Sequence, residues 1–152
     1  MTTEMIKAQA VLDLLYKPDA VYLKEISSYS TENKVVTGHF SIPLQPSYTK
    51  ESFGYVTAEN YIRCLSQLSY VLVGFLIEDG YPGSTFACTE TFNRLMVEQK
   101  MWFRWSDIHY SKNTAKNTNF PIILKLKNVK IWKAFVKHTQ PSFRYFSQLV
   151  FL

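Results

Sequence analysis

A row of uncharged polar side chains interrupts the apolar stretch GYVTAENYIRCLSQLSYVLVGFLIEDG, residues 54–80. Ser66 and Tyr70 stand four residues apart, and Gln67 and Tyr70 three apart, so on a helix all three can project toward one side. Asn60 lies nearer the start of the stretch. Hydroxyl and amide groups in this arrangement suit the binding of an activated carbonyl, such as a thioester, whose oxygen gains charge during reaction.

The start of the same stretch predicts where that oxygen would be held. Thr57 is a suitable N-cap and Gly80 a suitable residue just past the C-terminus, which together predict a helix over about residues 57–79. The first N–H groups of a helix are free, and the helix dipole places partial positive charge there. We therefore expect the amides near Val56, Thr57 and Ala58 to bind the substrate oxygen.

A purely structural interpretation competes with this one. Ser and Gln inside helices often bond neighbouring backbone, and Tyr often buries its ring with a locally satisfied hydroxyl. Cys64 on the same helix is more typical of a core residue than of a nucleophile, because no His stands nearby in sequence to lower the pKa of its thiol. Taken singly each polar residue fits the structural interpretation, whereas the cluster favours a site.

The other predicted elements surround this helix. Residues 3–15 are expected to form a short amphipathic helix that ends before Pro18. Alternation and turn residues predict a hairpin and three further strands, with a phase slip near Asn128: VYLKEISSYS and VVTGHFSIP joined by TENK, then LMVEQKMWFRW (95–105), FPIILKLKNVKIWKAFVKH (120–138) and SFRYFSQLVFL (142–152).

One enclosed helix with antiparallel strands on both sides of it in sequence predicts an α+β fold. A curved antiparallel sheet wrapped around one long central helix is the hot-dog architecture, and residues 1–152 are expected to form a single such domain. Because an open sheet leaves unpaired edges, we expect a homodimer or a higher homo-oligomer.

Composition restricts the partners. The 152 residues carry a net charge of +5, with 47% hydrophobic and 19% charged residues, as in a globular protein that attracts anions. No nucleic-acid-binding motif is present. Coenzyme A or a phosphopantetheine arm, as part of the substrate, would use the same positive charge, and an ordinary basic surface without an anionic partner is the alternative. Two cysteines without a C-x-x-C pair indicate no metal site, and no separate cofactor is expected. No secretory leader or run of about 18 apolar residues is found, which favours a cytoplasmic protein without a membrane span.

The segment from Gly38 to Tyr70 resembles the FcoT-type long-chain acyl-CoA thioesterases of the hot-dog superfamily. The strongest match is C-[LF]-x-Q-L-x-Y, which stands here as CLSQLSY, residues 64–70. The G-x-F of the preceding strand and the Tyr within PSYTK also agree. Weaker similarity extends over most of the chain and includes a tyrosine that Tyr16 matches.

The resemblance implies hydrolysis of fatty acyl-CoA or acyl-carrier-protein thioesters without a carboxylate base. The tyrosines around the thioester would be Tyr16, Tyr48 and Tyr70. The family's helix asparagine falls at Ser66, a shorter side chain, so Gln67 or Asn60 is expected to take its role, or the activity differs. Relatives of the family add glycine to an α,β-unsaturated acyl-carrier-protein thioester, and conjugate addition is therefore the alternative reaction.

His39 in GHFSIPLQP suggests a second branch of the superfamily. Hydroxyacyl-carrier-protein dehydratases carry a similar HFPxxPxxPG, in which the His is a general base assisted by a helix Glu. Arg63 stands where that Glu would be, so a dehydratase would lack half of its acid–base pair. His39 is therefore expected at most to contact substrate. A non-catalytic acyl-binding module and a nucleic-acid-binding β protein are the alternatives outside enzymes.

Overall fold

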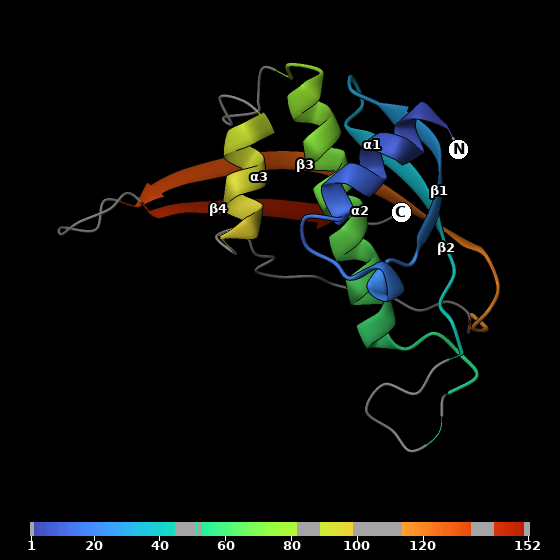
Figure 1. The fold of residues 1–152 in the computed structure, drawn as a ribbon. Helices are drawn as coiled ribbons and strands as arrows, with labels where there is room; N and C mark the ends of the chain where they lie inside the picture. Colours follow the sequence, from blue (N-terminus) through green and yellow to red (C-terminus); the bar gives the residue numbers. More distant parts are fainter. Residues whose placement is uncertain are drawn as a thin grey trace.

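The computed structural model describes residues 2–44, 51, 53–81, 89–98, 114–134 and 142–150, the last two ranges as backbone only from residue 127 onward. The described part is α+β, with an antiparallel sheet and a long helix packed against it (Figure 1). In chain order the elements are α1 (Thr3–Leu12), the 3-10 turn η1 (Pro18–Ala20), β1 (Leu23–Ser30), β2 (Val35–Phe40), α2 (Ala58–Glu78), α3 (Thr89–Val97), β3 (Phe120–Ala134) and β4 (Ser142–Val150).

The strands follow one another across the sheet in the order β1-β2-β3-β4, and every neighbouring pair is antiparallel. The predicted hairpin is confirmed, and Lys34 closes its turn at a φ of 52°. The phase slip predicted near Asn128 is also confirmed, because the register between β3 and β4 shifts between Leu126 and Asn128. Within this sheet β1 and β4 are the edge strands.

The long helix α2 begins and ends at the predicted residues. Thr57 and Asn60 form a capping box, in which each side chain accepts from the backbone N–H of the other residue. Gly80 has a φ of 65°, a left-handed conformation that glycine adopts without the penalty of a Cβ. Each of these signals depends on a few adjacent residues, so the bounds of the helix could be predicted from the sequence.

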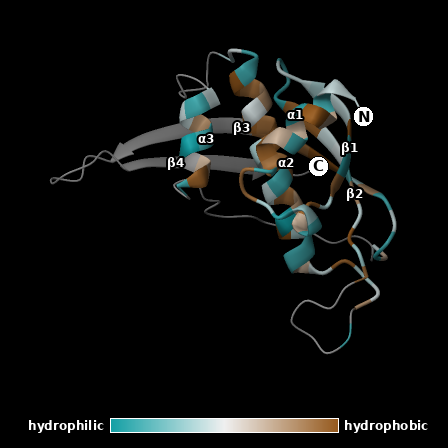
Figure 2. Cartoon of the chain, in the orientation of Figure 1, coloured by the Kyte–Doolittle hydropathy of each residue, from teal (hydrophilic) through white to brown (hydrophobic). Residues whose placement is uncertain are grey.

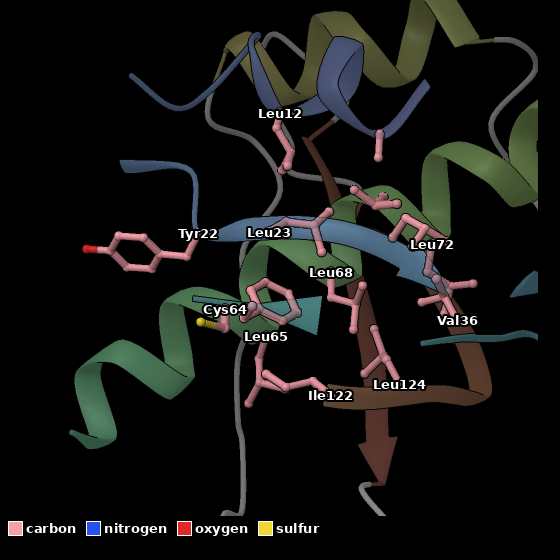
Figure 3. Close-up of a cluster of buried hydrophobic side chains, with 14 of the residues drawn as sticks. Leu12, Tyr22, Leu23, Val36, Cys64, Leu65, Leu68, Leu72, Ile122 and Leu124 are labelled. Carbon is pink, nitrogen blue, oxygen red and sulfur yellow. The ribbon is translucent and has the colours of Figure 1, made fainter. Parts of the chain in front are cut away.

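Apolar side chains of α2 fill the space between the helix and the sheet. Leu68, Val36 and Leu124 are fully buried there and lie together in the close-up of Figure 3. The helix approaches β2 so closely that a Cβ at Gly38 would lie 2.8 Å from Cδ1 of Leu68. Only glycine fits this point of the strand without displacing side chains. In Figure 2 the hydrophobic colour follows the part of α2 enclosed by neighbouring elements.

Residues 89–97 form α3, and this corrects the strand predicted from residue 95. Phe92 and Met96 are four residues apart and buried, and they pack with Ile77 of α2. This spacing is helical, so the apparent alternation that begins at Leu95 was misleading. Of the predicted strand, residues 99–105 lie outside the described residues.

By length and composition alone, α2 is apolar enough to cross a membrane. In the structure, 67% of its most apolar 18-residue stretch is buried inside the fold. The helix therefore has the surroundings of a core helix, packed between the sheet, α1 and α3 (Figure 1).

Candidate active site

Two hydroxyl groups meet on one side of α2, and a third stands one helical turn away. Tyr16 Oη and Ser66 Oγ lie 2.9 Å apart and share a hydrogen bond. A hydrogen bond with Ser66 also acts on the pKa of Tyr70, one helical turn further along α2. We call Tyr16, Ser66 and Tyr70 the hydroxyl cluster. All three were singled out from the sequence, Ser66 and Tyr70 by their spacing and Tyr16 by the family resemblance.

The end of α1 places Tyr16. The backbone N–H groups of Leu15 and Tyr16 both donate to the carbonyl of Leu12, at 3.0 and 2.9 Å, and close the last helical turn. Pro18 then begins η1, and Lys17 before it is extended, as proline favours for the preceding residue. The chain leaves α1 at this point, with the ring of Tyr16 against the main core.

The hydroxyl cluster lies where two apolar clusters meet. Tyr16 packs against the core between α2 and the sheet. Tyr70 packs against the smaller cluster of Ile77, Phe92 and Met96, which joins α2 to α3. Three polar groups between two apolar regions are expensive to keep unless they satisfy one another or a ligand.

Burial raises the pKa of both tyrosines above the ordinary value of 10.0. For Tyr70 the nearby Tyr16 raises the pKa further, and the hydrogen bond with Ser66 opposes the rise. For Tyr16 the hydrogen bond with Ser66 and the charge of Arg63 act in the lowering direction. Both side chains are therefore neutral phenols at pH 7. They can donate hydrogen bonds to a carbonyl oxygen, but they are poor bases.

Gln67, which we expected beside the substrate, instead binds backbone. Its Oε1 accepts from the N–H groups of Tyr22 at 3.0 Å and Leu23 at 3.3 Å, and its Nε2 donates to the carbonyl of Ala20 at 2.7 Å. The side chain is fully buried. Gln67 therefore ties the segment between η1 and β1 to α2, which is a structural role. Its partners lie more than forty residues away in sequence, so spacing within the helix carried no signal for them.

The start of α2 is also occupied by the protein itself. Thr57 N–H donates to Asn60 Oδ1 at 3.1 Å, and Asn60 N–H donates to Thr57 Oγ1 at 3.4 Å. The N–H of Val56 donates to the carbonyl of Thr114 at 2.7 Å. Asn60 and the amides of Val56 and Thr57 thus serve the helix cap and its anchoring. Ala58 follows the cap as an exposed residue.

His39, a further expected residue, does not join the hydroxyl cluster. On β2 the buried side chains alternate with half-buried ones, and His39 belongs to the half-buried set on the face opposite Val36 and Phe40. The sheet therefore separates His39 from the face that packs on α2. Tyr48 lies outside the described residues.

Arg63 is the charged residue that sequence reasoning left without a role in the preferred mechanism. It stands three residues before Ser66, and its Nη1 donates to the hydroxyl of Tyr22 at 2.9 Å. Its Nη2 donates to Glu59 at 2.9 Å. The four-residue spacing of Glu59 and Arg63 was the available signal for this ion pair.

A groove of about 650 Å³ runs between α1 and the start of β1, and its lining includes Met5, Gln9, Val21 and Leu23. No member of the hydroxyl cluster lines it. The polar side chain of Gln9 in this groove is already bonded to Asp13 at 2.6 Å. We therefore place the candidate chemistry at the hydroxyl cluster rather than in the groove.

Cys64 is fully buried on α2, and burial raises the pKa of its thiol strongly. This is the environment of an inert core cysteine rather than a nucleophile. Within the described ranges, no three His, Cys, Asp or Glu side chains come together as a metal-binding group.

The chain matches no protein-family model, and a search of curated proteins finds no similar sequence.

Proposed function

We propose that this protein is an acyl-thioester-processing enzyme that hydrolyses fatty acyl-CoA or acyl-carrier-protein thioesters. The observation that supports the proposal is the pairing of the Tyr16 and Ser66 hydroxyls, 2.9 Å apart, with Tyr70 one helical turn from Ser66 and two apolar clusters around them. Tyr16 and Tyr70 are also positions at which the sequence resembles FcoT-type thioesterases, whereas Ser66 stands where that family has an asparagine. Apolar surroundings with a few convergent polar groups are typical of sites for lipid-like ligands.

The fold is compatible with the proposal. A long helix packed against an antiparallel sheet is the central feature of the hot-dog architecture, and we propose that this chain has that architecture. Within the described residues β1 and β4 are the edge strands of the sheet, and pairing of an edge with a second copy would satisfy its outward backbone groups. We accordingly propose a homodimer as the working form.

In the proposed mechanism, the thioester carbonyl oxygen accepts hydrogen bonds from the neutral hydroxyls of Tyr16 and Tyr70. Ser66 donates its one hydroxyl proton to Tyr16 Oη, 2.9 Å away, and so holds that phenol in place while Tyr16 donates its own proton to the substrate. Water attacks the acyl carbon, negative charge grows on the carbonyl oxygen, and the C–S bond breaks as the thiol leaves with a proton. The acid and the free thiol are the products. Because the hydroxyl cluster contains no strong base, positioning and charge stabilisation supply the catalysis, and the turnover should be modest.

Release of free thiol from a panel of acyl-CoA and acyl-phosphopantetheine thioesters tests this function. Removing one hydrogen-bond donor to a developing oxyanion typically costs 10²–10³-fold in kcat, about 2.7–4 kcal/mol. We expect a loss approaching this range for Tyr70→Phe and for Tyr16→Phe. Tyr29→Phe is the matched control, because its hydroxyl donates to Asp79 at the far end of α2. Loss of turnover in the control as well, or full turnover in Tyr70→Phe, would contradict the mechanism.

The products distinguish hydrolysis from the alternative addition of glycine. Incubation with a crotonyl thioester and glycine leaves the C–S bond intact and adds the mass of glycine if conjugate addition occurs. Hydrolysis instead gives free thiol with or without glycine. A protein that binds these thioesters without changing either mass would be an acyl-binding module.

A further inference from the structure

Arg63 brings a positive charge to the side of α2 that carries the hydroxyl cluster. It precedes Ser66 by three residues, a spacing that places two side chains on neighbouring positions of one helix face. Its charge also acts on the Tyr16 hydroxyl, whose pKa it lowers against the effect of burial. Arg63 is thus close enough for its field to reach the proposed reaction centre.

Tyr22 holds the guanidinium in a defined place. The guanidinium carbon lies 5.6 Å from the ring centroid, and Nη1 donates to the Tyr22 hydroxyl at 2.9 Å. Tyr22 itself is buried, and its backbone is anchored by Gln67. Figure 3 shows the hydroxyl of Tyr22 directed away from the apolar cluster around Leu68. An arginine that is fixed in advance loses less conformational freedom when it binds a ligand.

The other partner of Arg63 is exchangeable. The side chains of Arg63 and Glu59 are 35% and 43% exposed, and such surface pairs contribute little because water screens them. Among the described residues, the bonds to Tyr22 and Glu59 use two of the five N–H groups of the guanidinium. The Tyr22 hydroxyl accepts from Arg63, so its own proton can be donated to the same ligand.

We propose that Arg63 and the Tyr22 hydroxyl bind an anionic group of the substrate, a carboxylate or a phosphate, next to the hydroxyl cluster. The inference rests on the proposed function, since it names the group that orients the thioester. The phosphate of a phosphopantetheine arm and a carboxylate on the acyl chain or on an amine nucleophile share this chemistry. Arginine recognises both through paired N–H groups.

Binding of non-hydrolysable thioethers tests the site without requiring turnover. The probes are an S-alkyl pantetheine, its 4′-phosphate, and an S-carboxyalkyl pantetheine, each titrated into the full chain by calorimetry. We expect one anionic probe to bind more tightly than the neutral one. Arg63→Met should lower the affinity for that probe by about tenfold or more, as for a lost hydrogen bond to a charged group. The affinity for the neutral probe should change by no more than about twofold.

Two further variants test the site independently in case Arg63→Met does not fold. Glu59→Gln removes the competing carboxylate and should tighten the anionic probe by about twofold. Arg63→Lys keeps the charge without the fork and should give an intermediate loss. Arg94→Met on α3 is the matched control for loss of one positive charge, and it should leave all three affinities unchanged.

The outcomes separate this proposal from the proposed function. Arg63-dependent binding of the phosphate or the carboxylate probe supports the site even if no thioester is turned over. Equal weakening of all three probes by Arg63→Met, or equal effects of the Arg94 control, overturns the site while thioester turnover remains intact. If none of the probes binds, the anion site is overturned, and release of free thiol alone then decides the proposed function.

Discussion

Exchange of Gln67 for leucine tests whether this polar residue of α2 has a structural role, in contrast to the chemical role proposed for Ser66 and Tyr70. The amide of Gln67 is fully buried and serves three backbone groups, the N–H of Tyr22, the N–H of Leu23 and the carbonyl of Ala20. Leucine has a similar volume but offers none of these bonds. The substitution therefore leaves the three backbone groups without partners and opens no large cavity.

The magnitude follows from those three groups. A buried polar group left unsatisfied costs about 1–3 kcal/mol, and local relaxation toward water reduces the sum. We expect Gln67→Leu to lower the free energy of unfolding by about 3–6 kcal/mol. Domains of this size are stable by about 5–15 kcal/mol, so this variant should be near the limit of folding at 25 °C.

Urea unfolding followed by circular dichroism measures the effect, with Ser66→Ala as the neighbouring control. Ser66→Ala removes a hydroxyl bonded to Tyr16 and should cost only about 1 kcal/mol of stability, while it lowers thioester turnover. If Gln67→Leu costs less than about 1 kcal/mol, the three bonds are not made in solution. The structural assignment of Gln67 would then be refuted.

A second variant of the same residue gives a pH-dependent result. Gln67→Glu keeps an acceptor for the two N–H groups, but when ionised it faces the carbonyl of Ala20 with no donor. Burial raises the pKa of the introduced carboxyl above its ordinary value of about 4.3. The stability that the variant retains is therefore present at low pH and is lost as the pH rises through the folded-state pKa. Wild type should show no such loss between pH 5 and 8 from this position.

Three other predictions concern the helix contact, the hairpin and the tyrosines. Gly74→Ala places a Cβ 3.0 Å from Cγ2 of Val11, so crowding of about 1–3 kcal/mol should outweigh the gain in helix propensity of about 1 kcal/mol. In a Val11→Ala background the same change should stabilise, as thermal unfolding of the double variant will measure. The pKa of Asp79 is lowered from 3.8, mainly by the hydrogen bond from a threonine of the hairpin turn. The stability that Asp79 contributes is therefore present above pH 3.8 and is lost as the pH falls through the lowered pKa of the folded state. Asp79→Asn should flatten the acid limb of a pH–stability curve. Because burial raises the pKa of Tyr70 above 10.0, turnover should not fall through ionisation of this residue below pH 10, and a decline near pH 8 that Tyr70→Phe abolishes would contradict its place in the mechanism.

The parts of the fold that sequence predicted are those with local causes. The cap at Thr57, the glycine at position 80 and the phase slip near Asn128 each depend on a few adjacent residues, and all are confirmed. The segment at 89–97 was missed because its helical period appears only when Phe92 and Met96 are considered together. The alternation that begins at Leu95 suggested a strand instead.

The candidate site divides in the same way. The spacing of Ser66 and Tyr70 placed them on one face, and the structure brings Tyr16 to them from fifty residues away. Gln67 has a residue type and a helix position that suit a site residue. Its hydrogen-bond partners, however, are backbone groups of a distant segment. The helix sequence alone does not distinguish a side-chain amide that is available to bind a ligand from one that is hydrogen-bonded to the main chain.

The docking of α1 also has a consequence for the order in which the molecule assembles. A helix of 10 residues is marginal in water by itself, and α1 packs mainly against α2 and β1. During synthesis α1 emerges before either partner, and Glu78 must leave the ribosome before the whole of α2 is available. The tyrosine that follows α1 therefore reaches Ser66 late, and the early chain must keep the apolar side of its first helix unprotected until then.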